Sequence, residues 1–402
     1  MIRLERLIKL IVMMQRRFMM RKLPTAWLQL THERVRLLVA LAGISFAVIL
    51  IFMQMGLRDA LFDSAVRMHE SLKGDVFLIS PRSTALIGMR RFSERRLFQT
   101  LAFEDVEKVS PIYLDFAQWR NPETFRTRQI FVIGFEPGDN VFNLPGVAEN
   151  GARLKMPDVV LFDDASRIEF GPVADWFNQG RPVSTEVENR RLRVAGLFTL
   201  GTSFGSDGNL MTSTPNFLRV FTRRSKGLID VGLIRLKPGS NTEAVVQKMR
   251  QYLPKDVKVF SKQEFVDFEK NYWQTSTAIG FIFDLGAMLG LIVGIVIVYQ
   301  VLYTDVSDHL MEYATLKAIG YTNGYLLSVV FQEALILSVL GFVPGFTVTL
   351  GLYSMAKSAT LLPIGMDANR AMLVMMLTVF MCFVAGAIAV RKLRAADPAD
   401  IF

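Results

Sequence analysis

The stretch DVSDHLMEYATLKAIGYTNGYLLSVVFQE, residues 305–333, separates two long apolar segments of the chain. It begins with polar and charged side chains and returns to a helical apolar pattern from Tyr325, so Glu333 already lies in the next apolar segment. The pattern predicts a short polar helix over 305–320, held at a membrane surface by the helices on either side. We expect this polar helix to be where another protein exerts force on the chain, and we expect Glu333 to serve helix packing.

Composition is typical of a membrane protein. Of the 402 residues 51 % are hydrophobic, and the mean hydropathy is +0.31. The apolar residues gather in four runs, each at least as long as the roughly 20 residues that a helix needs to cross a bilayer. A long, more polar segment follows the first run. The predicted fold class is therefore a membrane protein with four transmembrane helices and a large α+β extracytoplasmic domain inserted between helices 1 and 2.

The apolar runs divide the chain into consecutive parts. The predicted parts are a cytoplasmic or interfacial N-terminal helix over 1–36, a first span over 37–57, an insert over 58–275, a second span over 278–303, a cytoplasmic coupling loop over 304–323, a third span over 324–356, a fourth span over 371–390 and a cytoplasmic tail over 391–402. Pro344 and Gly345 predict a bend or a break in the third span. Gly286, Gly290 and Gly294 recur every four residues in the second span. They therefore share one helix face and predict close helix packing, within the chain or between copies.

The distribution of charge predicts the orientation in the membrane. Net charge is +9, and basic residues lie before the first span and after the last, among them Arg34, Arg36 and Arg391. This positive-inside pattern places both termini in the cytoplasm and the insert in the periplasm, and it argues against nucleic-acid binding. A cleaved signal peptide is the alternative to an interfacial N-terminal helix, but no small-x-small cleavage site follows Met13–Met14.

The insert alternates between strand and helix patterns. Residues 93–109 have apolar residues at helical spacing and predict an amphipathic helix. Residues 228–261 predict a strand–helix–strand unit in which Asn241 or Thr242 caps the helix. Turn-rich sequence over 136–227 predicts a small β-rich subdomain inserted between two α+β pieces that pack together. The single cysteine, Cys382, lies in an apolar run, so no intrachain disulfide can stabilise the insert.

The sequence contains no motif that indicates a catalytic residue, a cofactor site or a metal site. HExxH and Cys/His metal spacings do not occur, and no GxxxxGK[ST] phosphate cradle is present. We therefore expect a non-enzymatic protein that binds no ATP itself. Arg90, Arg91, Arg95 and Arg96 form a basic cluster, either a solvated helix face or a surface for an anionic partner or lipid headgroups.

Four segments carry a resemblance to a known family. They are AWLQLTHERVRLLVALAGISFAVILIFMQMGLRDALFDSA (26–65), VGIVIVYQVLYTDVSDHLMEYATLKAIGY (293–321), TLLPIG (360–365) and RKLRAADPADIF (391–402). In these segments the chain resembles the FtsX/MacB-type permeases of ABC transporters, most closely the DevC branch of cyanobacterial glycolipid exporters. The resemblance runs from about Met20 to the end. The first nineteen residues go beyond the usual start, so Met1, Met19 and Met20 are alternative starts.

The resemblance implies a function and a set of partners. The insert would be a MacB-like periplasmic domain, with porter-like halves over 58–135 and 228–275 and a β-rich insert over 136–227. The permease would be a homodimer in the inner membrane that works with a separate ABC ATPase, which uses the ATP, and with a periplasmic membrane fusion protein and a TolC-like outer-membrane protein. The residues placed to contact the ATPase would be Asp308, His309, Glu312, Tyr313, Leu316 and Lys317.

Three classes of function follow for comparison. The first is a permease that relays motion of the ATPase to its periplasmic domain, a mechanotransmission mechanism, and so drives export of a lipid or glycolipid. The second is a non-transport signal transducer that controls a periplasmic partner. The third, a membrane-bound enzyme, has no catalytic constellation to support it.

Overall fold

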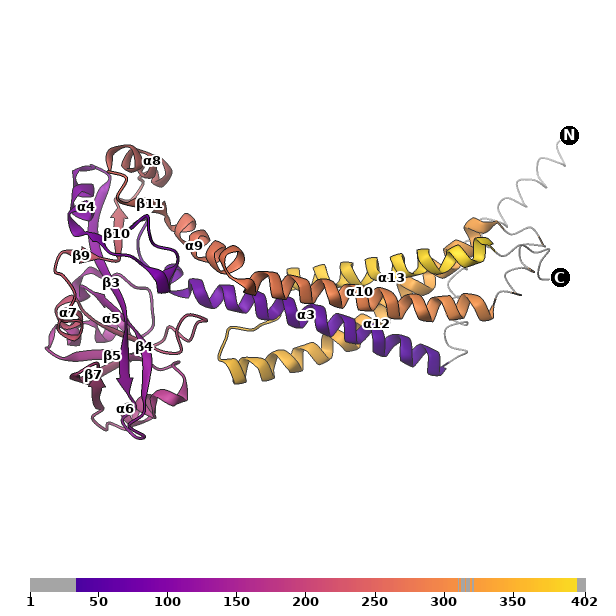
Figure 1. Cartoon of the computed structure of the whole chain (residues 1–402), viewed down its shortest axis with the longest axis horizontal. Coiled ribbons are helices and arrows are strands. Elements are labelled where there is room, and N and C mark those ends of the chain that lie inside the picture. Colours follow the sequence, from indigo (N-terminus) through magenta and orange to yellow (C-terminus); the bar gives the residue numbers. More distant parts are fainter. Residues whose placement is uncertain (1–33, 310, 312–314, 316–318, 320–321, 396–402) are drawn as a thin grey trace. The chain divides into compact units, whose positions relative to one another are not determined.

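The computed structural model describes residues 34–309, 311, 315, 319 and 322–395, which form two compact units (Figure 1). Of the described residues, the helical unit contains those within 34–57, 282–355 and 364–395. The insert unit contains residues 58–281 and 356–363. Each unit has its own core and is described by itself.

Four long helices are the only helices of the described chain that are long and apolar enough to cross a membrane. They are α3 (Arg34–Ser71), α10 (Ala278–Asp308), α12 (Asn323–Thr360) and α13 (Ala368–Ala395). At 38 residues α3 is about 57 Å long, well beyond the ~30 Å thickness of a bilayer core. Helix α3 thus continues past the predicted span 37–57. Helix α10 likewise includes residues 304–308, which the sequence pattern had assigned to the coupling loop.

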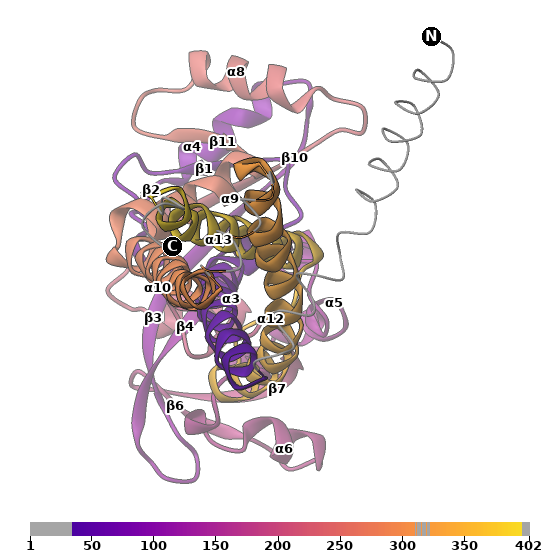
Figure 2. The same cartoon turned by 90° about the vertical axis from the view of Figure 1, so that its right-hand side faces the viewer.

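Helix α3 packs against glycine-bearing faces of α10 and α12, and the four helices lie together in the end-on view (Figure 2). A Cβ atom built on Gly286, Gly290 or Gly294 of α10 would lie within 3.3 Å of an atom of α3. On α12, a Cβ at Gly345 would lie 2.9 Å from Val48 Cβ and 3.0 Å from the Ser45 carbonyl oxygen. Glycine therefore lets the helix backbones approach closely, within a single chain.

Of the predicted bend or break at Pro344 and Gly345, the break is wrong, because α12 is one continuous helix with Pro344 inside it. Proline removes one backbone N–H from a helix, which would ordinarily leave a carbonyl without its donor. Here Ser45 of α3 donates a hydrogen bond to the Gly341 carbonyl at 2.9 Å, and Thr349 donates to the Gly345 carbonyl at 2.8 Å. The carbonyl that the proline itself leaves without an N–H donor belongs to Leu340, one residue before Gly341, so Ser45 adds a bond from α3 in the turn that the proline weakens, as membrane helices allow.

The insert unit is built on a sheet of nine strands in the order β11-β1-β10-β3-β4-β8-β5-β7-β6. The short strands β2 and β9 pair with each other in a separate two-stranded sheet. The strands are β1 (Val76–Ile79), β2 (Phe92–Ser93), β3 (Val106–Arg120), β4 (Thr127–Phe135), β5 (Val159–Asp163), β6 (Ser184–Val187), β7 (Arg190–Phe198), β8 (Asn209–Ser213), β9 (Leu228–Ile229), β10 (Val231–Leu236) and β11 (Lys258–Ser261). Most neighbours are antiparallel, whereas β4–β8 and β5–β7 are parallel.

Both faces of this sheet are buried, because successive residues of a strand point to opposite sides. On β1, Val76 and Leu78 belong to one hydrophobic cluster, whereas Phe77 and Ile79 belong to another. The first cluster takes side chains from α4 (Glu94–Gln99), α6 (Val173–Asn178), α7 (Thr214–Val220) and α8 (Thr242–Tyr252). The second takes them from the last turns of α3, from α5 (Val147–Asn150) and from α9 (Lys262–Asn271).

The β-rich segment 136–227 is not a subdomain apart, because its strands continue the main sheet through β3. The first half of β3 pairs with β10 and the second half with β4, so one strand of 15 residues belongs to both regions. The sheet then curls until β6 returns to β3, where Val187 pairs with Trp119. Trp119 is fully buried there and donates through Nε1 to the Phe170 carbonyl at 3.0 Å.

Local predictions in the insert met different outcomes. The helix predicted over 93–109 is only partly present, because α4 ends at Gln99 and Val106 already opens β3. From Val106 onward the residues pair with β10 as a strand, so their apolar side chains pack into the sheet and not along a helix face. The cap of α8 is confirmed, since the Asn241 side chain accepts a hydrogen bond from Ala244 N at 3.1 Å.

We expect Gly345→Ala to destabilise the protein by about 1–3 kcal/mol, the cost of overpacking a tight contact. A Cβ at this position meets the backbone oxygen of Ser45, which cannot move aside as a flexible side chain can. Gly351→Ala in the same helix is the control, because nothing lies within 4 Å of its Cβ position. Thermal unfolding of the detergent-solubilised protein measures both; equal melting temperatures for the two variants would contradict the packing argument.

Candidate coupling site and buried polar clusters

The coupling site begins with an ion-pair cluster that joins the first turn of α3 to the last turn of α10. Arg36 lies 2.5 Å from Asp308 and 3.6 Å from Asp305, measured between guanidinium nitrogens and carboxylate oxygens. The side chain of Arg36 is 23 % exposed, whereas Asp308 is 49 % exposed and Asp305 only 8 %. The His309 ring nitrogen Nδ1 lies 3.0 Å from the Asp305 backbone carbonyl. One arginine thus holds two helix ends together through two carboxylates.

Two of the six predicted ATPase-contact residues, Asp308 and His309, lie in this cluster. Glu312, Tyr313, Leu316 and Lys317 lie outside the described residues. Asp308 therefore has an intrachain partner, Arg36, which the sequence pattern indicated only as part of the basic flank of the first span. The predicted topology could have indicated the Arg36–Asp308 pair, because it places the start of the first span and the end of the second on the same side of the membrane.

Beyond His309 the described residues expose an apolar stripe that the sequence analysis missed. Met311, Thr315 and Ile319 are all exposed, and the two apolar side chains are 60 % and 71 % exposed. Thr315 Oγ1 donates to the Met311 carbonyl at 2.9 Å, and Ile319 N donates to the Thr315 carbonyl at 3.0 Å. These i to i−4 bonds and the spacing of four place the three side chains on one helical face. The same spacing was visible in the sequence and could have identified the stripe.

Glu333 lies on α12 and is fully buried, with 0 % of its surface exposed. Neither carboxylate oxygen has a hydrogen-bond partner within the described part of the chain, and its carboxyl lies within electrostatic range of Asp305. Next to it in the sequence, Ala334 lies close to Gly386 of α13. Glu333 thus lies inside the helix packing and away from the exposed stripe, in line with the expectation from the sequence.

The insert unit contains a second buried polar cluster, formed by His69 of α3 and Glu269 of α9. His69 Nε2 and Glu269 Oε2 are 3.7 Å apart, and both side chains are at most 2 % exposed. Glu269 also accepts hydrogen bonds from Trp273 Nε1 at 2.9 Å and from Leu86 N at 2.7 Å. Burial raises the pKa of the Glu269 carboxyl to about 7, although these two donors act in the opposite direction.

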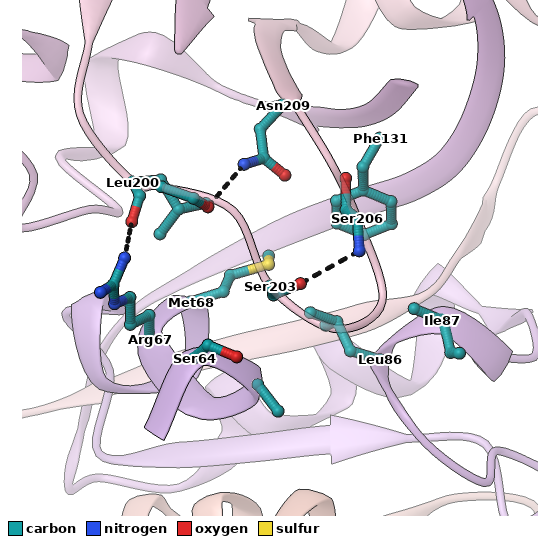
Figure 3. Close-up of a pocket in the computed structure, with 12 residues that line it drawn as sticks. Ser64, Arg67, Met68, Leu86, Ile87, Phe131, Leu200, Ser203, Ser206 and Asn209 are labelled. Carbon is teal, nitrogen blue, oxygen red and sulfur yellow. Dashed lines mark hydrogen bonds between the residues drawn. The ribbon is translucent and has the colours of Figure 1, made fainter. Parts of the chain in front are cut away.

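A small hollow next to α3 in the insert unit is lined by Ser64, Arg67, Ser203 and Asn209 among other residues (Figure 3). Its volume of about 20 Å³ admits about one water molecule and no larger ligand. Its polar groups bond to their own neighbourhood. Arg67 donates to the Leu200 carbonyl at 3.2 Å, and Asn209 donates to the Gly201 carbonyl at 3.1 Å. The hollow is therefore a feature of packing.

Comparison with known proteins identifies the family. Residues 37–252, more than half of the chain, match the family described as MacB-like periplasmic core domain, and residues 285–398 match the family described as FtsX-like permease C-terminal. The chain belongs to the FtsX/MacB type of ABC transporter permease. An uncharacterised ABC transporter permease of Mycobacterium tuberculosis, matched in two strains, is 22 % identical to this permease over 378 residues, which cover 93 % of this chain and 97 % of the relative.

Solved structures of related domains are also similar to this permease. The periplasmic region of MacB from Actinobacillus actinomycetemcomitans is 12 % identical, covers 50 % of this chain and 94 % of that chain, and has a TM-score of 0.35. The extracellular domain of the ABC-type transporter YknZ from Gram-positive bacteria is 11 % identical, covers 47 % of this chain and 100 % of that chain, and has a TM-score of 0.33.

The family fits the architecture of the molecule. The helix α3 at the start of the described chain is followed by an α+β domain and then by the region matched as FtsX-like. The four apolar helices and the periplasmic-type domain fit a protein of the inner membrane. The permease is the membrane subunit of an ABC transporter, a class of system that takes its energy from ATP.

We expect Glu269, whose ordinary pKa of 4.5 rises to about 7 in the fold, to contribute a fall in stability between about pH 4.5 and pH 7. Between these two values the unfolded chain has released the proton while the folded chain still holds it, so this contribution to the free energy of unfolding decreases by about 3 kcal/mol as pH rises. Burial lowers the pKa of the neighbouring His69 to about 3, so His69 contributes in the opposite direction between about pH 3 and pH 6.5. Glu269→Gln removes the first contribution and leaves the second. Melting temperatures of wild type and variant from pH 4.5 to 8 measure the effect, and identical pH slopes would contradict it.

We expect Arg36→Ala to destabilise the permease by about 1–3 kcal/mol, because it takes a charged partner from the nearly buried Asp305. The double variant Arg36→Ala/Asp305→Asn should recover part of the loss, since an amide is less costly than a carboxylate to keep away from water. Arg34→Ala, at an exposed arginine in the same turn, is the control. If the double variant melts no higher than Arg36→Ala alone, the two groups are not coupled.

Proposed function

We propose that the permease relays motion of a separate ATPase to its periplasmic domain and thereby drives export of a lipid or glycolipid. The observation that carries this proposal is the exposed stripe of Met311, Thr315 and Ile319, which directly follows the Arg36–Asp305–Asp308 cluster. Exposed apolar residues at helical spacing are typical of a helix that docks into a groove of a partner. The sequence has no phosphate cradle of its own, which supports a separate ATPase.

The cluster suggests how force on the stripe would reach the rest of the permease. Asp308 is the last residue of α10, and Arg36 lies in the first turn of α3. Helix α3 is continuous to Ser71, and its residue Met68 belongs to a core of the insert together with Leu72, which directly follows the helix. Force applied at the stripe would therefore act on α3 and α10 together. The backbone continues from each of these two helices into the insert. Such coupling becomes a mechanism when two states of the pair are demonstrated.

The remaining parts of the proposal come from the resemblance to the DevC branch. The permease would act as a homodimer with both termini in the cytoplasm, and it would work with a periplasmic membrane fusion protein and a TolC-like outer-membrane protein. Basic residues such as Arg34 and Arg36 at the start of the first span support this orientation. Bound ATP would lie in the ATPase alone, with no cofactor in the permease.

Purification of the tagged permease in mild detergent tests the partners. We expect an ABC ATPase and a membrane fusion protein to copurify, and a lipid-like compound to accumulate in cells that lack the permease. Recovery of neither partner counts against the export proposal. Recovery of a periplasmic hydrolase without any duct protein would favour a signal transducer instead.

We expect Met311→Glu/Ile319→Glu to weaken ATPase binding by about tenfold or more, because apolar anchors carry much of the free energy of such contacts. Ile168→Glu is the matched control, since Ile168 is 88 % exposed on the insert unit. Binding of the purified ATPase to each variant measures the effect. Equal affinities for the double variant and the wild type would remove the stripe from the interface.

A charge-reversal pair addresses the predicted contact residues directly. We expect Glu312→Lys/Lys317→Glu to uncouple ATP hydrolysis from export, because reversed charges would face their former partners with the same sign. The measurements are ATPase stimulation by the permease and export in cells. Unchanged values of both would show that these two residues do not contact the ATPase.

A further inference from the structure

An open groove on the insert unit consists of two adjoining hollows with volumes of about 910 and 480 Å³. Arg91 and Asp115 line both hollows and so mark the place where they meet. The first hollow runs beside β2 and the loop before β11, and the second runs past the end of α7. We call the two hollows together the basic groove.

Positive charge dominates the lining of the basic groove. Its cationic residues are Arg82, Arg90, Arg91, Arg190, Arg219, Arg223, Arg224 and Lys255, and its acidic residues are Asp115, Glu188 and Asp256. Two of the acids are already committed to ion pairs. Asp115 lies 3.3 Å from Arg91 and 3.2 Å from Arg224, and Asp256 lies 2.9 Å from Arg96.

Four cations of the groove are left uncompensated. Arg82, Arg90, Arg223 and Lys255 are exposed, and within the described residues their charged groups make no ion pair or hydrogen bond. A surface normally intersperses charges of both signs, because like charges that share a hollow repel one another. These four cations come from three separate loops, so their proximity is a product of the fold.

The floor of the groove includes the buried Arg224, whose own contacts do not neutralise these four cations. Arg224 is buried, donates to the Leu114 carbonyl at 2.9 Å and forms an ion pair with Asp230. Its guanidinium group also lies 5.0 Å from the centre of the Phe217 ring. Burial, and next the positive charge of Arg91, lower the pKa of Arg224 to about 10, so the group stays charged at neutral pH.

We propose that the basic groove binds phosphate groups of a ligand long enough to reach both hollows. Arginine accounts for all but one of the cations, and its planar fork of N–H donors matches the oxygens of a phosphate. A dianionic phosphate can offset the positive charge of several cations at once, which suits the four uncompensated cations of the groove. The lining is mostly polar, so the groove receives the charged part of a ligand and not an acyl chain.

The test uses the full-length permease in nanodiscs of zwitterionic lipid and two kinds of probe. Inorganic tripolyphosphate represents a soluble phosphate, and dihexanoyl phosphatidic acid, kept below its micelle concentration, represents a lipid headgroup. Dihexanoyl phosphatidylcholine controls for binding through the acyl chains. Calorimetry and melting temperatures report binding at several salt concentrations, because contacts between exposed charges weaken as salt rises.

The groove variant is Arg82→Gln/Arg90→Gln/Arg223→Gln, and the matched control is Arg95→Gln/Arg126→Gln/Lys248→Gln. The control removes the same charge from exposed cations outside the groove. We expect the groove variant to bind tripolyphosphate about tenfold more weakly or worse, and the control to bind like the wild type. We also expect the groove variant without ligand to melt no lower than the wild type, because repulsion among its cations is relieved.

The outcomes separate a site from a merely charged surface. If the groove variant loses binding of phosphatidic acid but not of tripolyphosphate, while the control variant keeps both, the phosphate of the ligand belongs to a lipid headgroup. If it loses binding of tripolyphosphate but not of phosphatidic acid, the ligand is a soluble phosphate. Equal weakening in groove and control variants would overturn the proposal, since the binding would then follow net charge. Weakened binding of an acidic partner protein without any binding of either phosphate probe would also overturn it, in favour of a protein-docking surface.

Discussion

The close approach of α3 to α10 and α12 is the contact on which the helical unit depends. Lipid tails are as apolar as leucine side chains, so a membrane protein gains little by burying apolar surface between helices and relies on tight packing. Glycines at Gly290 and Gly345 permit that packing, and Ser45 adds a hydrogen bond to α12 near its proline. A larger side chain at these positions would move the ends of α3 and α10, and with them the Arg36 cluster.

In the insert unit, β3 has the corresponding role. It pairs with β10 along its first half and with β4 along its second, and it meets β6 again at Trp119. One strand thereby ties together the strands from both ends of the insert and those from its middle. Both faces of the sheet are covered, and the long apolar strands are protected by helices on each side.

Charges in the permease fall into groups with different environments. Arg36 and Asp305 lie close together where water has little access, so each depends on nearby groups of opposite charge or polarity. Cations of the basic groove lie in the open and keep their charge available to a ligand. The exposed stripe at Met311 and Ile319 is apolar, which suits contact with a protein. The Arg36 cluster therefore suits ion pairing between helix ends, the basic groove suits binding of phosphate, and the exposed stripe suits docking of a partner protein.

The sequence by itself determined the four apolar helices, the position of the insert and the family, because a bilayer requires runs of apolar residues whose length and spacing are visible in one dimension. It also indicated Gly286, Gly290 and Gly294 as one helix face and Glu333 as a residue that serves helix packing. Only the tertiary structure decided that α12 continues through Pro344, that β3 unites the insert, and that Arg36 meets Asp308. Each of these depends on groups far apart in the chain, such as Ser45 beside Gly341, and local patterns carry no information about such partners. For the same reason, only Arg90 and Arg91 of the basic groove stood out in the sequence, as part of one basic cluster, and their meeting with the other arginines in one groove was decided by the fold.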